Sequence, residues 1–151
     1  MTEEKLEDFR QDFALFIEAG FVAVKQLDET SAKRLFHAAQ VLDPESTAPQ
    51  IGLGYVALNK LEVKEASEIF EKVRKQEPDN YLAQAFLGIC YLLVKSKREE
   101  GEKLIDEAKK QSKDETVQNL CKISLDWAEK DLKKRDKKAP FFSNQSPEET
   151  K

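Results

Sequence analysis

A spacing of 34 residues recurs along most of this chain and constrains its fold more than any other feature. It is carried by Gly20, Gly54 and Gly88, by Pro44 and Pro78, and by the pairs Ala32/Phe36 and Ala66/Phe70. A fixed period of this length is typical of stacked supersecondary units. Proline cannot continue a helix and pushes the residue before it out of helical geometry, so each proline predicts the end of one unit.

The residue types in this repeat have a physical reason in pairs of antiparallel helices. Glycine in the first helix and alanine in the second allow the two to approach closely, and phenylalanine fills the space where one pair packs on the next. The sequence therefore predicts an all-α fold with no β-sheet. We expect seven helices, near 4–27, 30–42, 47–59, 63–76, 81–94, 97–111 and 115–135.

The repeated positions resemble the tetratricopeptide repeat (TPR), whose pattern is W-x2-L-G-x2-Y, then A-x3-F, then P. The three copies read Phe16-x2-Ala19-Gly20 with Ala32-x3-Phe36 and Pro44, Leu53-Gly54 with Ala66-x3-Phe70 and Pro78, and Leu87-Gly88-x2-Tyr91 with Gly101-x3-Ile105. The likeness covers residues 13 to about 113. It departs from the pattern at the tryptophan position, which holds Phe16, Gln50 and Gln84, and in the third copy, which lacks the closing proline.

The resemblance implies a solenoid of three helix-turn-helix repeats, about 13–46, 47–80 and 81–113. Apolar residues at helical spacing from Val117 to Leu132 predict a capping helix, about 115–135, with Asp114 as its N-cap. The TPR domain would then span 1–135. Two prolines and many polar residues predict a disordered tail over 136–151.

Composition argues against several classes of function. The formal net charge of −4 and a pI near 5.3 disfavour a nucleic-acid binder, which needs a basic surface. His37 is the only histidine, and no catalytic arrangement, cofactor motif or metal-ligand spacing is found, so we do not expect an enzyme. Cys90 and Cys121 lie among apolar residues and indicate buried thiols in a reducing compartment. The acidic start MTEEKLEDF lacks a signal-peptide core, and no apolar run could span a membrane, so we expect a cytoplasmic protein.

Ligand-binding TPR proteins use residues near positions 2, 5, 9 and 12 of each repeat to line a concave groove. Carried over to this chain, that pattern selects twelve residues, none of them charged: Ala14, Ile17, Phe21, Val24, Ala48, Ile51, Tyr55, Leu58, Leu82, Ala85, Ile89 and Leu92. An exposed groove of this kind predicts a binding site for an amphipathic helix of a protein partner. Ile17 and Phe21 occupy the places where carboxylate-binding TPR co-chaperones carry Lys and Asn, so that function is not expected. Coverage of the groove by residues 1–11, by Phe141 and Phe142, or by homodimerisation stays open.

Three repeats, one C-terminal helix and an apolar groove are similar to the small TPR chaperones of bacterial type III secretion systems. The segments LFHAAQVLDPES, IGLGYVALNKLEVKEASEIFEKV and AFLGICYLL carry that likeness. It implies a role in protein transport and virulence: holding an amphipathic helix of a secretion substrate in the bacterial cytosol, so that it does not polymerise early. The branch that binds the needle subunit, usually with a second small helical co-chaperone, fits better than the branch that binds extended translocator segments. The alternative is a TPR scaffold or assembly factor that associates with itself or with another protein.

Overall fold

The computed structural model describes residues 2–132. Its seven α-helices are α1 (Glu3–Lys25), α2 (Glu29–Leu42), α3 (Ala48–Asn59), α4 (Val63–Gln76), α5 (Tyr81–Leu92), α6 (Arg98–Gln111) and α7 (Glu115–Trp127). A 3-10 turn, η1 (Lys95–Lys97), precedes α6, and a π-helical turn, η2 (Ala128–Leu132), follows α7. No strand occurs between residues 2 and 132, so the all-helical prediction is confirmed.

The predicted helix boundaries agree closely with the observed ones. All seven helices start within one residue of the predicted position, and the first six end within two residues of it. Two predictions, the end of the last helix at 135 and the disordered tail over 136–151, lie outside the described residues. The helices α2 and α4 each end two residues before a proline, at Leu42 and Gln76, as expected from the repeated prolines.

Short polar side chains start several of these helices. The carboxylate of Asp28 accepts a hydrogen bond from the Ser31 amide at 3.1 Å, and Asn80 does the same for Ala83 at 3.0 Å. The predicted N-cap of α7 is confirmed, because the Asp114 side chain accepts from the Thr116 amide at 2.8 Å. Such caps satisfy amides that have no partner within the helix.

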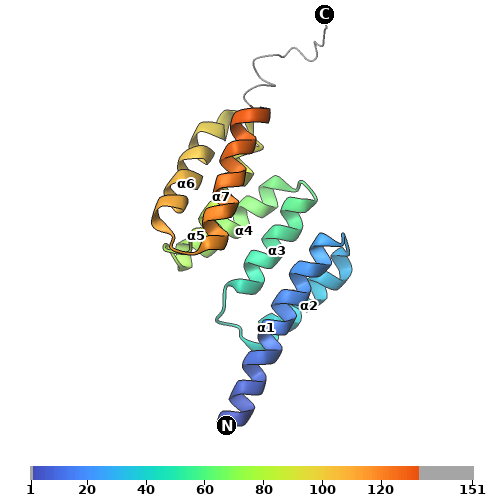
Figure 1. The fold of residues 1–151 in the computed structure, drawn as a ribbon. Coiled ribbons are helices and arrows are strands. Elements are labelled where there is room, and N and C mark those ends of the chain that lie inside the picture. The colour runs from blue at the N-terminus through green and yellow to red at the C-terminus, as the bar shows by residue number, and fades with distance from the viewer. Residues whose placement is uncertain (1, 133–151) are drawn as a thin grey trace, which may run out of the picture.

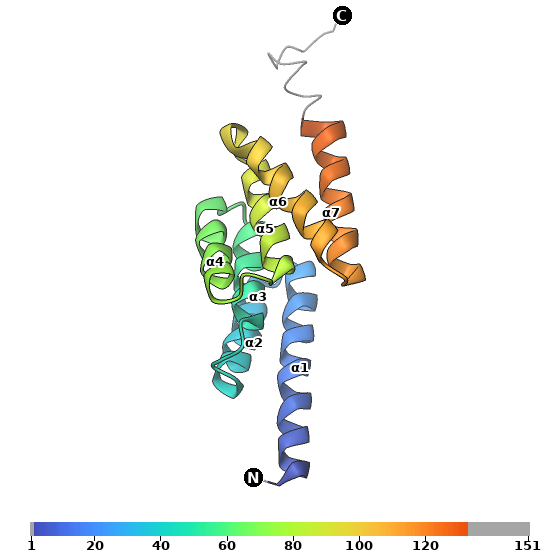
Figure 2. The same cartoon turned by 90° about the vertical axis from the view of Figure 1, so that its left-hand side faces the viewer.

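The helices pack in two interlocking sets. Each helix contacts the next one along the chain, and α1, α3, α5 and α7 also contact one another in that order, so the odd-numbered helices form a continuous layer. Figures 1 and 2 show this succession from α1 at one end to α7 at the other. Three core clusters lie along it, the first around Phe36, the second around Phe70 and the third around Ile105.

The repeated glycines lie where two helices approach most closely. A Cβ atom at Gly54 would lie 2.7 Å from the Phe70 ring, and one at Gly88 would lie 2.5 Å from Ile105 Cγ1. The predicted contact between the two helices of one unit is therefore confirmed at both glycines. The Phe36 ring, which is fully buried, sits against both Gly20 of α1 and Gly52 of α3. One ring thus joins the first helical pair to the second.

The length and the composition of the helices bear on function. The first helix is 23 residues long against 14 for its neighbour α2, and its N-terminal part projects beyond the packed helices (Figures 1 and 2). Among the helices described here, none combines the length and apolar character that crossing a membrane requires.

Candidate partner-binding surface

The two central helices of the odd-numbered layer carry no charged side chain. Neither α3 nor α5 contains Asp, Glu, Lys, Arg or His, although charged residues make up 36% of the chain. By contrast, α4 and α6 alternate acidic and basic residues with apolar ones. An uncharged helix is suited to burial on more than one side. The layer built on α3 and α5 is therefore the main candidate for a binding surface.

The twelve predicted groove residues differ in how far they are buried. Phe21, Tyr55 and Ile89, spaced by 34 residues, are all half-buried. Ile17, Ala48 and Leu82 are half-buried as well, and Ala14 is exposed. These seven side chains retain surface that a partner could contact.

The other five predicted residues belong to the protein's own core, which corrects the expectation that all twelve face outward. They are Val24, Ile51, Leu58, Ala85 and Leu92, each 9% exposed or less. Each of the five belongs to one of the three core clusters: Val24 to the first, Ile51 and Leu58 to the second, and Ala85 and Leu92 to the third. A charge at Leu58 would consequently disturb the core and not only a binding surface, contrary to the prediction that Leu58 points away from it.

The five accessible residues with side chains larger than alanine are treated as one surface, the odd-helix strip, defined as Ile17, Phe21, Tyr55, Leu82 and Ile89. Phe21 and Tyr55 meet with ring centroids 5.7 Å apart, and Tyr55 meets Phe86 at 5.4 Å. Phe21 also contacts the buried Phe36 edge to face at 5.2 Å. Because these rings rest on core rings, the strip is held in place before any partner arrives.

Tyr55 supplies the one side-chain hydroxyl of the strip. That oxygen has no hydrogen-bond partner among residues 2–132, whereas the Tyr55 carbonyl accepts a bond from the Asn59 amide at 2.9 Å. A tyrosine in this position offers apolar area together with one polar group that can orient a ligand.

The groove pattern was carried over to the first three odd-numbered helices only, and this omitted α7. Adding 34 to the positions of Phe21, Tyr55 and Ile89 reaches Ile123, whose side chain is 69% exposed on α7. The same register holds for the buried side of α7, since Leu87 and Cys121, also 34 apart, are both buried. The 34-residue spacing from Ile89 to Ile123 was the signal that could have placed Ile123 in line with the strip.

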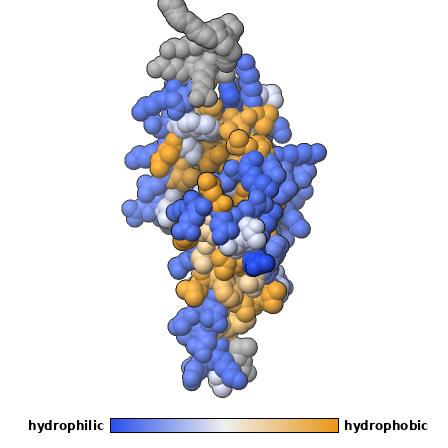
Figure 3. Space-filling model, turned by 90° about the vertical axis from the view of Figure 1, so that its right-hand side faces the viewer, coloured by the Kyte–Doolittle hydropathy of each residue, from blue (hydrophilic) through white to orange (hydrophobic). Residues whose placement is uncertain are grey.

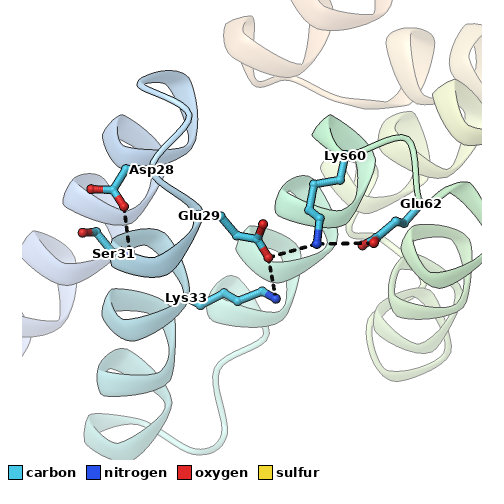
Figure 4. A network of polar contacts seen from close by, with 6 residues as sticks. All are labelled: Asp28, Glu29, Ser31, Lys33, Lys60 and Glu62. Atoms are coloured by element: carbon cyan, nitrogen blue, oxygen red, sulfur yellow. Dashed lines mark hydrogen bonds and ion pairs between the residues drawn. The ribbon is translucent and has the colours of Figure 1, made fainter.

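Charged groups gather instead at the turns that join the helices (Figure 4). The Glu29 carboxylate contacts Lys33 Nζ at 2.7 Å and Lys60 Nζ at 3.0 Å, and Lys60 reaches Glu62 at 3.3 Å. The hydrogen bonds from Lys33 and Lys60 lower the pKa of Glu29, and those to Glu29 and Glu62 raise the pKa of Lys60. This network links the first helical pair to the second at the surface.

The groups with chemical reactivity are dispersed. Cys90 and Cys121 are free thiols and both are buried, as predicted; burial raises the pKa of Cys90 to about 11 and also raises that of Cys121. His37 is exposed, with Nδ1 2.9 Å from Gln40 Oε1. Across the described part of the chain, no cluster of His, Cys, Asp and Glu has the arrangement of a metal site. No protein-family model matches the sequence, and no similar sequence is found among the curated proteins.

Proposed function

We propose that this chain is a TPR-type solenoid that binds an amphipathic helix of another protein along the odd-helix strip. The proposal is supported by the agreement between the 34-residue period and the packing, in which glycines meet bulky side chains of the paired helix at Gly20, Gly54 and Gly88. It is supported as well by the continuous layer of odd-numbered helices, which corresponds to the concave side of such a solenoid.

A single observation carries the proposal: the half-buried side chains of Tyr55, Leu82 and Ile89 lie on helices α3 and α5, which contain no charged residue. Apolar surface of this kind is usually a binding site in a soluble protein. An amphipathic helix can bury its apolar face against such a strip without leaving a charge unpaired. Aromatic side chains near the centre of an interface commonly dominate its affinity, which singles out Phe21 and Tyr55 as anchors.

The partner class comes from the resemblance to type III secretion chaperones. In this proposal the ligand is the amphipathic helix of a needle subunit, and the chaperone covers the face through which the subunit would polymerise. An open helical filament grows by repeating one non-closing contact, so covering one face stops growth. An interface of ordinary size would bury about 1,200–2,000 Å² in total. A second small helical co-chaperone would complete the complex.

The experiment has two stages. The tagged protein is purified from its native cells, and co-eluting chains are identified by mass spectrometry. Binding of the partner is then compared for Tyr55→Ala, in the middle of the strip, and Ile123→Glu, at the exposed position of α7 that continues it. Leu61→Glu is the matched control, because Leu61 is 71% exposed in the turn after α3 and lies outside the strip.

We expect both strip variants to keep native circular dichroism and to weaken binding strongly, with Ile123→Glu placing an unpaired carboxylate against apolar surface. The partner should raise the melting temperature of the wild type in a concentration-dependent way, because it binds only the folded state. Full binding by both strip variants would remove the strip as the site. An extended bound segment, in place of a helix, would favour the translocator-chaperone alternative.

A scaffold that associates with itself or with another large protein is the second candidate. Exposed apolar side chains outside the strip favour it, among them Leu15 at 62% and Val41 at 80% exposure on the first helical pair. Dependence of the molecular mass on concentration separates a self-associating scaffold from a monomeric chaperone.

A further inference from the structure

The projecting part of α1 carries an apolar face that lies outside the core clusters, with Leu6 38% exposed and Phe9 and Phe13 half-buried. Leu6, Phe9 and Phe13 follow one another at three- and four-residue steps and share the face on which Gly20 meets Phe36. None of the three belongs to a core cluster, although Ile17 and Phe21 further along the helix do. The face that enters the core therefore continues outward along the projecting segment.

The projecting segment is acidic in net charge. Asp12 lies beside one edge of the apolar face together with Lys5, and Asp8 lies four residues before Asp12 on the same side of the helix. Neither carboxylate has an ion-pair or hydrogen-bond partner among residues 2–132. Between Glu3 and Phe13 the segment holds five acidic residues and two basic ones, a formal charge of −3. The projecting segment is thus an amphipathic helix of acidic net charge whose apolar face lies outside the core clusters.

The outer face of α2 offers complementary chemistry. A shallow hollow of about 650 Å³ is lined there by Glu29, Thr30, Lys33, Arg34, His37, Ala38 and Val41. Arg34 has no ion-pair partner within the described residues, and Val41 is 80% exposed beside it. Glu29, the one acid, is already paired with Lys33 and Lys60. Figure 3 shows apolar surface gathered over the first helical pair, next to the hydrophilic end of α1.

The segment cannot reach this hollow in its own chain. Because α1 is one continuous helix from Glu3 to Lys25, its first turns are carried away from α2 and do not fold back (Figure 2). The prediction that residues 1–11 cover the chain's own groove is opposed by the same geometry for the described part of that segment. A second molecule has to bring the two surfaces together.

We propose that the projecting part of α1 docks on the outer face of α2 in a second copy of this chain. Asp8 and Asp12 then face Arg34, and Phe9 and Phe13 cover Ala38 and Val41. Residues 3–13 form about 16 Å of helix, which fits along the roughly 21 Å of α2. When each copy contributes both surfaces, the contact is reciprocal and closes as a two-fold dimer. This interface is separate from the odd-helix strip and does not depend on the proposed function.

Sedimentation equilibrium of the full chain tests the proposal over a range of protein and NaCl concentrations. We expect a monomer–dimer equilibrium that weakens as salt rises, because the contact between exposed charges is screened. Arg34→Glu should weaken dimerisation at least tenfold, and the triple variant Asp8→Lys, Asp12→Lys, Arg34→Glu should restore it. Lys72→Glu, a charge reversal at an exposed site on α4, and Ile123→Glu should leave it unchanged.

Three results would overturn the proposal: a monomer at every concentration, a dimer indifferent to Arg34→Glu, or a dimer lost in Ile123→Glu. The last result would mean that the α1 segment occupies the odd-helix strip. Arg34→Glu is also expected to retain binding of the co-purifying partner. That measurement keeps the failure of this inference distinct from a failure of the proposed function.

Discussion

Replacing Gly52 with alanine tests the packing of the first two helical pairs most sharply. The Phe36 ring lies between Gly20 of α1 and Gly52 of α3. A Cβ atom at Gly20 would lie 2.5 Å from Phe36 Cε1, and one at Gly52 would lie closer still. The ring is fully buried, so it cannot move away from one glycine without approaching the other.

The magnitude follows from two opposing effects. An added methyl group in a packed core costs about 1–3 kcal/mol. Alanine is the better helix former, which returns about 1 kcal/mol in a helix interior. Since the ring is confined on both sides, we place the steric cost at the upper end and expect Gly52→Ala to destabilise the protein by about 1–2 kcal/mol. That corresponds to a fall in the melting temperature of about 2–8 °C.

Urea and thermal unfolding, followed by circular dichroism, measure this loss. The control is the same substitution in a Phe36→Leu background, where the shorter side chain leaves room for the methyl group. There the cost of Gly52→Ala should disappear, so that the double-mutant cycle yields a coupling of about 1–3 kcal/mol. Equal costs in both backgrounds, or a stabilised Gly52→Ala single variant, would refute the proposed confinement of the ring.

Three further predictions concern the turns and the thiols. Leu61 has φ of 61° and is 71% exposed, so Leu61→Gly should relieve strain and stabilise the protein by up to about 1 kcal/mol; an unchanged or lower melting temperature would contradict this. Iodoacetamide at pH 8 should modify Cys90 far more slowly in the native protein than in urea, because burial raises its pKa to about 11; equal rates by mass spectrometry would exclude a closed core. The pKa of Glu29 is lowered in the folded state, so its contribution is complete above the unfolded-state pKa and is lost as pH falls through the folded-state pKa. The stability difference between wild type and Glu29→Gln should therefore shrink on acidification, and a constant difference from pH 7 to pH 3 would be inconsistent with the network.

Local signals in the sequence were sufficient to predict where the helices start and end. Pro44 and Pro78 mark the ends of α2 and α4, and Asp114 marks the start of α7, because capping and chain-breaking depend on a few neighbouring residues. The glycine contacts could also be predicted, since the 34-residue period repeats one packing geometry. The wedge of Phe36 against Gly52 was not foreseen, because Gly52 lies outside the repeated positions.

The candidate surface was predicted less completely. Tyr55 and Leu58 are both uncharged and lie three residues apart on the same helix, yet Tyr55 is half-buried and Leu58 belongs to the core. Periodicity identifies the apolar faces of a helix but not which neighbour covers each of them. In this molecule the packing of neighbouring helices decides which faces are covered, and Ile123 on α7, the last of the odd-numbered helices described, stays exposed.

Site-specific photo-crosslinking tests most directly whether the odd-helix strip binds a partner. A photo-reactive phenylalanine analogue is placed at Tyr55, and in a second protein at Glu68, which is exposed on α4 away from the strip. After irradiation of the native complex, we expect crosslinks from position 55 to the apolar face of a partner helix and none from position 68. Crosslinks from position 68 alone, with the complex intact, would contradict it.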